Sequence, residues 1–209
     1  MKTIAVIINV GNMPFADLAL KANEKYYNHF GIEMHVVTEH IEQTKNTSPV
    51  WMKSFLHDMF DADMIIAQDL DILPCNLKYN IEDFLIKDEF SFAVDTTMVG
   101  QRVGSASFPY FRYNAGLSVI PKRHSELMKK VFEIGVSDPH NWHTYDQYYL
   151  NEHIGEHHIF VNELPQIFNW FFNPTLDMNK LAFCHYTNFM ATPRKREYIL
   201  KHHPKEMLE

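Results

Sequence analysis

Two aspartates separated by a single residue directly follow an apolar stretch of the chain. Asp69 and Asp71 come after Met64–Ala67, a continuous apolar run that is typical of a strand buried on both faces. Where such a strand ends and the chain turns, both carboxylates can point toward one cation. Two hard oxygen ligands suit Mg²⁺ or Mn²⁺, which complete their coordination with water and substrate phosphates. The pattern therefore indicates a divalent-metal site, and the alternative is a solvated acidic turn.

Other polar or small residues fall where apolar segments begin or end. They are Asp95, Asn114-Ala115-Gly116, Asp146-Gln147 and His185. Small residues around Gly116 allow a ligand to approach the backbone closely, and an imidazole at a strand end can be a third metal ligand. The structural alternatives are a turn before a strand, a helix with a polar face, and a histidine that is hydrogen-bonded in the core.

The spacing of apolar residues predicts the elements that hold these groups. Strands are expected at Ile4–Val10, Met34–Thr38, Met64–Ala67, Phe90–Val94, Ala115–Ile120, Ile159–Val161 and Leu181–Cys184, and helices at 15–30, 51–60, 127–132 and 144–154. The first strand, helix and strand form a β-α-β unit, which is typical of a parallel sheet covered by helices. Ligands bind beyond the carboxyl ends of the strands in such sheets. The aspartates and His185 fall at such ends, so one cleft can collect them.

Length and composition limit the class of protein. The 209 residues are expected to form one domain over 1–209, with a short basic helical tail at about 193–209. The formal net charge of −7 argues against a nucleic-acid-binding protein, which normally carries a basic surplus. No apolar stretch approaches the roughly 18 residues of a membrane-spanning helix, so no transmembrane segment is expected. Two cysteines without a Cys-x-x-Cys spacing favour a reducing, cytoplasmic setting.

Taken in order along the chain, these motifs resemble those of GT-A glycosyltransferases. The set consists of Asp69-Leu70-Asp71 after a buried strand, Tyr113-Asn114-Ala115-Gly116-Leu117-Ser118-Val119-Ile120, Asp146-Gln147, and His185 after an apolar run. It is most similar to the glycogenin and galactosyltransferase-like family, glycosyltransferase family 8, over roughly residues 3–188. The resemblance implies a single GT-A, Rossmann-like α/β domain whose mixed, mostly parallel central sheet is flanked by helices.

The resemblance also implies an activity and a set of site residues. The activity is transfer of a hexose from UDP-glucose or UDP-galactose to an unidentified acceptor, with retention of configuration and with Mn²⁺ as cofactor or Mg²⁺ as the alternative. By the resemblance, Asp69, Asp71 and His185 bind the metal, Asp146 and Gln147 are the catalytic residues that flank the reacting carbon, and the donor is bound by Val10, Gly11, Asn12, Lys53, Asp69, Leu70, Asp71, Asp95, Asn114, Ala115, Gly116 and Asn188. An inverting reaction would instead need a carboxylate base, for which Asp146 is the candidate.

The chain departs from the family pattern in two places. Tyr148 stands where the family has a second aspartate after the Asp-Gln pair. In the family's His-x-x-Gly-x-x-Lys motif, Asn188 replaces the glycine and Ala191 replaces the lysine that binds pyrophosphate. A substitute cation is expected from the tail, where the candidates are Arg194, Lys195 and Arg196.

Two other functions stay open. A phosphohydrolase of the haloacid dehalogenase type would use Asp69 as a nucleophile that forms an aspartyl phosphate, but the motif follows a full β-α-β unit and no later Gly-Asp-x-x-x-Asp motif exists. The other is a catalytically weak protein that binds nucleotide sugars. The 13 histidines include the pairs His157-His158 and His202-His203, which we interpret as exposed polar residues. The basic tail is interpreted as a solvated helix, with contact to an anionic membrane or an acceptor as the alternative.

Overall fold

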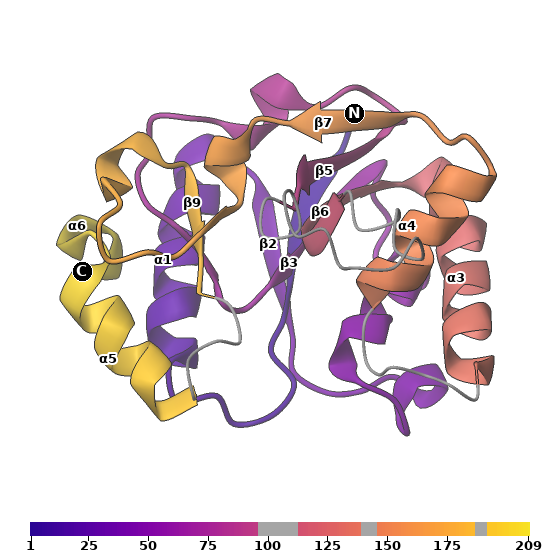
Figure 1. The fold of residues 1–209 in the computed structure, drawn as a ribbon, viewed down its shortest axis with the longest axis horizontal. Coiled ribbons are helices and arrows are strands. Elements are labelled where there is room, and N and C mark those ends of the chain that lie inside the picture. Colours follow the sequence, from indigo (N-terminus) through magenta and orange to yellow (C-terminus); the bar gives the residue numbers. More distant parts are fainter. Residues whose placement is uncertain (96–112, 139–145, 187–191) are drawn as a thin grey trace, which may run out of the picture.

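A six-stranded sheet lies at the centre of the protein, in a computed structural model that describes residues 1–95, 113–138, 146–186 and 192–209. The strands are β1 (Thr3–Ile8), β2 (Glu33–Val37), β3 (Met64–Asp69), β5 (Phe90–Val94), β6 (Tyr113–Pro121) and β7 (Val161–Leu164), in the order β2-β1-β3-β6-β5-β7 (Figure 1). Strand β6 runs antiparallel to β3 and β5, and the other neighbouring pairs are parallel. The predicted α/β fold with a mixed, mostly parallel sheet is confirmed.

Alternate side chains of the strands enter two hydrophobic cores, because successive residues of a strand point to opposite faces of a sheet. In β3, Ile66 packs in the core on one face, and Ile65 and Ala67 pack in the core on the other. In β6, Val119 and Ile120 divide in the same way. Burial on both faces explains the unbroken apolar run at Met64–Ala67 in the sequence.

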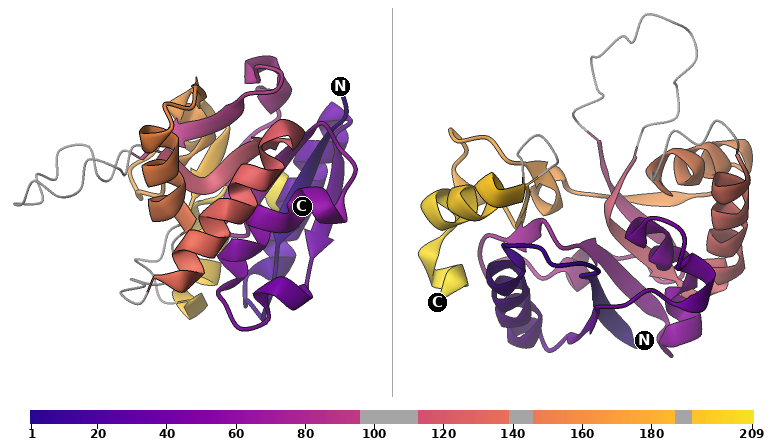
Figure 2. Two further views of the ribbon diagram at one scale, coloured as in Figure 1. Left: turned by 90° about the vertical axis from the view of Figure 1, so that its right-hand side faces the viewer. Right: turned by 90° about the horizontal axis from the view of Figure 1, so that it is seen from below.

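Helices cover both faces of the sheet. They are α1 (Ala16–Phe30), α2 (Leu56–Met59), α3 (Ser125–Ser137), α4 (Asp146–Glu156), α5 (Thr192–His202) and α6 (Lys205–Leu208). Helix α1 lies on one side of the sheet, and α3 and α4 lie on the other (Figure 1; Figure 2). The segment predicted as a helix over 51–60 is a 3-10 helix at Pro49–Phe55 followed by the single turn of α2. Within the described ranges, no helix is both long and apolar enough to cross a membrane.

Helix α1 ends where the sequence predicts. Gly31 has a φ of 72°, a left-handed conformation that glycine adopts without a steric penalty. Its N–H donates to Asn28 O at 3.2 Å, and the N–H of Ile32 donates to Tyr27 O at 2.9 Å. These bonds satisfy carbonyl groups of the last helical turn and lead the chain into β2.

The apolar pattern does not predict a second sheet of three short strands. Its order is β4-β9-β8, with β4 at Ile72–Pro74, β8 at Trp170–Phe171 and β9 at Phe183–His185. Strands of two or three residues are too short to show a period in the sequence. The predicted strand at Ile159–Val161 is also misplaced, because β7 begins at Val161 and Phe160 is exposed.

The tail forms helices, as predicted, but the interpretation as a solvated helix is wrong. Lys195, Ile199, His203 and Met207 are all buried, and the spacing of Lys195 and Ile199 places them on one face of α5. Ile199 and Met207 belong to the hydrophobic core that α1 covers. The interpretation of the histidine pairs as exposed also fails for His203, whose Nε2–H donates to Pro74 O at 2.9 Å. The tail therefore belongs to the packed domain.

Candidate functional site

One edge of the central sheet collects several of the predicted site residues. Asp69 ends β3, where it lies opposite Ile8 at the end of β1. Because β6 runs antiparallel to β3, the first residues of β6 lie at this same edge. Asn114 pairs there with Ala93, shortly before Asp95. The topology thus brings Asp69, Asp95 and Asn114 together, as predicted from the strand ends.

The small second sheet positions Asp71 and His185. Ile72 of β4 pairs with His185 of β9, and the backbone N–H of Tyr186 donates to Asp71 O at 2.8 Å. One ligand atom each of Asp69, Asp71 and His185 lie within 4.8 Å of one another. Two carboxylates and an imidazole fit Mg²⁺ or Mn²⁺, and three protein ligands leave coordination positions for a substrate. The donor set of this chain therefore suits the metal that the sequence implies.

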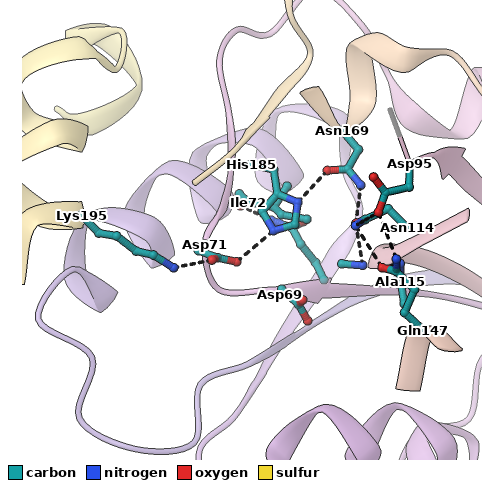
Figure 3. Close-up of polar contacts among 12 residues, drawn as sticks. Asp69, Asp71, Ile72, Asp95, Asn114, Ala115, Gln147, Asn169, His185 and Lys195 are labelled. Atoms are coloured by element: carbon teal, nitrogen blue, oxygen red, sulfur yellow. Dashed lines mark hydrogen bonds and ion pairs between the residues drawn. The ribbon is translucent and has the colours of Figure 1, made fainter. Parts of the chain in front are cut away.

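Asp71 is held by two neighbours (Figure 3). Lys195 Nζ lies 2.6 Å from Asp71 Oδ2, and His185 Nε2 lies 3.4 Å from Asp71 Oδ1. Burial raises the pKa of Asp71, but His185 and Lys195 outweigh burial and hold this pKa at about 2. Among the candidate cations of the tail, Lys195 reaches the site, whereas Arg196 forms a surface ion pair and Arg194 is exposed.

A buried lysine lies beside Asp69 on the inner side of the site. Lys53 Nζ lies 2.8 Å from Asp69 Oδ1 and 3.3 Å from Asp146 Oδ2. It also donates to Ala115 O at 2.7 Å. Burial lowers the pKa of Lys53, but the carboxylates of Asp146 and Asp69 outweigh burial and raise it above its ordinary value. Burial raises the pKa of Asp146 to about 6, against the opposing effect of Lys53. Asp146 is thus enclosed beside a lysine.

Gln147 connects the sheet edge to the first turn of α4. The pairing of β5 with β6 shifts between Phe92 and Ala93, and such a bulge releases backbone groups from the ladder. The N–H of Ala115 donates to Gln147 Oε1 at 3.1 Å. Gln147 Nε2 donates in turn to Asp95 Oδ2 at 3.0 Å. The structure therefore brings together two of the residues expected near the sugar of the donor.

A chain of amide hydrogen bonds sets the orientation of the His185 ring (Figure 3). Gly116 N–H donates to Asn114 Oδ1 at 3.0 Å, which identifies that atom as the amide oxygen, and Asn169 Nδ2 donates to the same atom at 2.7 Å. Asn169 Oδ1 consequently faces His185 Nδ1 at 3.0 Å, so this nitrogen carries the proton. With the hydrogen bond to Asn169 made through Nδ1, Nε2 is the nitrogen that faces the metal-ligand group and can bind a metal ion. Asn169 is a site residue that the motifs do not reveal.

The absence of a side chain at Gly116 makes room for this arrangement. A Cβ atom there would lie 2.9 Å from Asn114 Oδ1, from His185 Cε1 and from Ile72 Cδ1. Phe171 stacks on the His185 ring with the ring centroids 5.1 Å apart. The groups that approach the backbone at Gly116 are therefore side chains of the protein itself.

Asn169→Ala is expected to weaken Mn²⁺ binding by about 10- to 100-fold, the usual effect of losing a group that orients a metal ligand. The variant removes the acceptor of the His185 Nδ1–H and allows the other tautomer. Free Mn²⁺ is measured by its EPR signal, and the tautomer by nitrogen NMR shifts of His185. Asn162→Ala is the matched control, because Asn162 makes two side-chain hydrogen bonds away from the site. Equal Mn²⁺ affinities in the two variants would contradict the orienting role.

The remaining predicted donor-binding residues lie apart from this network. Val10, Gly11 and Asn12 follow β1, which ends beside Asp69 at the same sheet edge. The side chain of Leu70 is buried in the hydrophobic core. Asn188 lies outside the described residues.

Comparisons with known proteins find matches among solved structures but none among family models or curated sequences. No protein-family model and no curated protein matches the chain. A glycosyltransferase involved in the glycosylation of the major capsid of PBCV-1 matches with a TM-score of 0.70 at 13% identity, over 94% of this chain and 99% of that chain. An active-site mutant of LgtC matches with a TM-score of 0.60 at 13% identity, over 95% of this chain and 96% of that chain.

GlyE of Streptococcus pneumoniae TIGR4 is a third structural match. Its TM-score is 0.58 at 14% identity, over 96% of this chain and 61% of the GlyE chain. At such identities the likeness concerns the fold. The chain therefore has the GT-A-like α/β fold that its motifs predict.

Proposed function

We propose that this protein is a metal-dependent glycosyltransferase that moves a hexose from UDP-glucose or UDP-galactose to an acceptor with retention of configuration. The proposal rests on one observation. Asp69, Asp71 and His185 each offer one ligand atom, and these three atoms lie within 4.8 Å of one another at the strand ends of a GT-A-like fold. The structural matches are themselves glycosyltransferases, which supports the same class of activity. The uridine base, the hexose and Mn²⁺ follow from the resemblance of the motifs.

The side chains of the site are oriented before a donor binds. A divalent metal on Asp69, Asp71 and His185 would neutralise the diphosphate of the donor and make UDP a better leaving group. Lys53 fixes the carboxylate of Asp69, and Asn169 fixes the ring of His185. Such preorganised ligands need little rearrangement as charge develops on the departing diphosphate.

Gln147 is the residue that we assign to the sugar side of the site. Its Oε1 accepts hydrogen bonds from Asn114 Nδ2 and Ala115 N–H, both at 3.1 Å, and its Nε2 binds Asp95. These bonds hold the amide at the sheet edge, where it can stabilise the sugar as the bond to UDP breaks. Asp146, in contrast, is enclosed beside Lys53. An inverting reaction needs an accessible carboxylate base, so this enclosure favours retention.

Lys195 is proposed to supply the cation that the sequence lacks at Ala191. Its Nζ contacts Asp71 Oδ2, so it lies beside the position that a metal-bound diphosphate would occupy. An ammonium group has three N–H donors. Lys195 can therefore bind a phosphate oxygen while it keeps its contact with Asp71.

Lys195→Met is expected to change two affinities in opposite directions. UDP binding in the presence of Mn²⁺ should weaken by about 10- to 150-fold, because a hydrogen bond to a charged group contributes about 1.5–3 kcal/mol. Mn²⁺ binding without nucleotide should strengthen, because the variant removes a cation from Asp71. Both are measured by calorimetric titration. Arg196→Met is the matched control, since Arg196 binds Asp17 at the surface. A loss of UDP affinity in the control and not in Lys195→Met would assign the role to Arg196.

The activity is tested by release of UDP from UDP-glucose and UDP-galactose, with Mn²⁺ and with EDTA. Slow, metal-dependent hydrolysis of one donor in the absence of acceptor is the expected result. Binding of the donor without any turnover would support the catalytically weak binding protein instead. Release of phosphate from a simple phosphomonoester would support a phosphohydrolase that uses Asp69 as its nucleophile.

A further inference from the structure

A second group of possible metal ligands lies at the last turn of α4. One ligand atom each of His153, Glu156 and His157 lie within 4.8 Å of one another. The N–H of His157 donates to His153 O at 3.1 Å, so the helical pattern continues through His157. Residues four apart share one face of a helix, and the centroids of the two imidazole rings are 4.1 Å apart. His157 is therefore part of a His-x-x-x-His pair, and not only of the pair with His158.

No other described residue forms a hydrogen bond or an ion pair with these three side chains. His153 is only 6% exposed, yet within the described part of the chain no hydrogen bond or ion pair reaches its ring nitrogens. The same holds for the side chains of Glu156 and His157, which are exposed. The ring nitrogens of His153, next to a second imidazole and a carboxylate, are therefore available to a ligand that the protein itself does not supply.

Opposite charges lie around the His153 ring. Lys130 of the neighbouring helix α3 acts on this ring, and the carboxylate of Glu156 supplies negative charge that offsets Lys130.

We propose that His153, Glu156 and His157 bind a Zn²⁺ ion. Two imidazoles and one carboxylate suit zinc, which binds such ligands at about 2.0–2.2 Å and leaves a fourth position for water. Harder cations such as Mg²⁺ and Mn²⁺ favour oxygen ligands and suit the aspartate pair better. The buried ring of His153 is fixed by its surroundings, while the exposed side chains of Glu156 and His157 can rotate to close the coordination shell.

This site is distinct from the metal-ligand group of Asp69, Asp71 and His185. It lies on α4, the helix that also carries Asp146 and Gln147. Asp146 and Gln147 lie in the first turn of α4, about 15 Å along the helix axis from Glu156. A cation at the last turn also lies near the negative end of the helix dipole. Zinc is therefore expected to stabilise α4 and to raise the melting temperature of the chain, without contacting the sugar donor.

The test is a zinc titration of the tag-free, metal-free full chain that carries Asp71→Asn, which weakens the other metal-ligand group. A chromophoric chelator reports the zinc affinity by competition. His157→Asn and Glu156→Gln are made in this background, and both positions are exposed. His158→Asn is the matched control, because His158 is exposed, lies outside the group and has a φ of 50° that asparagine tolerates.

We expect one equivalent of zinc in the parent and in His158→Asn. In His157→Asn and in Glu156→Gln the affinity should fall by at least about tenfold, as for other changes at metal sites. Circular dichroism confirms that each variant is folded. Equal zinc affinities in His157→Asn and His158→Asn, or no zinc uptake by the parent, would overturn the proposal. Because the titration uses neither donor nor turnover, its result is independent of the proposed transferase activity.

Discussion

Asp71→Asn is expected to reduce metal-dependent turnover of a UDP-hexose by at least about 100-fold, the order found when one group that stabilises developing charge is removed. Asp71 is one of two carboxylates in the metal-ligand group, and its pKa of about 2 keeps it charged at neutral pH. An amide replaces this anion with a neutral ligand. Mn²⁺ affinity should therefore fall together with turnover, and both are measured on the same preparation.

The control for this prediction is a matched change far from the site. Asp61 forms an exposed ion pair with Lys122, and Asp61→Asn should leave both Mn²⁺ affinity and turnover unchanged. Calorimetry and UDP release then separate a lost metal site from a general effect of removing an aspartate. Wild-type Mn²⁺ affinity in Asp71→Asn would contradict the assignment of Asp71 as a ligand.

Lys53→Met is expected to lower the free energy of unfolding by about 3–5 kcal/mol, as when one partner of a buried ion pair is removed. Lys53 is almost fully buried and neutralises Asp146, whose side chain is 9% exposed. Methionine fills a similar volume but leaves that carboxylate without its cation and Ala115 O without its donor. Urea denaturation measures the effect. Lys122→Met, at an exposed pair, should cost at most about 1 kcal/mol.

The loss of stability caused by Lys53→Met should be smaller at low pH than at high pH. The pKa of Asp146 in the folded chain is about 6, above its ordinary value of 3.8, so between these values the folded state holds a proton that the unfolded state releases. This group therefore lowers stability as the pH rises through that window. Without Lys53 the pKa of Asp146 rises further, so the variant should lose less stability at pH 5 than at pH 8. A penalty that is the same at both pH values, or unchanged by adding Asp146→Asn, would contradict an electrostatic origin.

The sequence predicts the parts of the fold that depend on long periodic segments. Strand β3 and helix α1 lie within one or two residues of their predicted bounds, because an unbroken apolar run and a helical spacing are strong local signals. Strands β4 and β8 are not predicted. They are held by pairing with β9, and a strand of two or three residues carries no local signal of that pairing.

The same distinction applies to the site. Asp69, Asp71 and His185 are predicted because their types and their places at strand ends indicate a metal site. Asn169 is not predicted, since its role depends on contacts with residues 16 and 55 positions away in the sequence. Lys195 is one of three adjacent cations in the sequence, and only the packing of α5 selects it.

The most direct test of the account is a thermal denaturation series on the wild-type chain with UDP, GDP, CDP or ADP, each with Mn²⁺ or with EDTA. A ligand at 100 times its Kd stabilises a protein by about 2.7 kcal/mol, which for a chain of this size raises the melting temperature by about 5–10 °C. The account predicts such a rise with UDP and Mn²⁺ together, and none when EDTA replaces the metal. The same rise in EDTA, or no rise with any nucleotide and Mn²⁺, would contradict a metal-dependent nucleotide-sugar site at Asp69, Asp71 and His185.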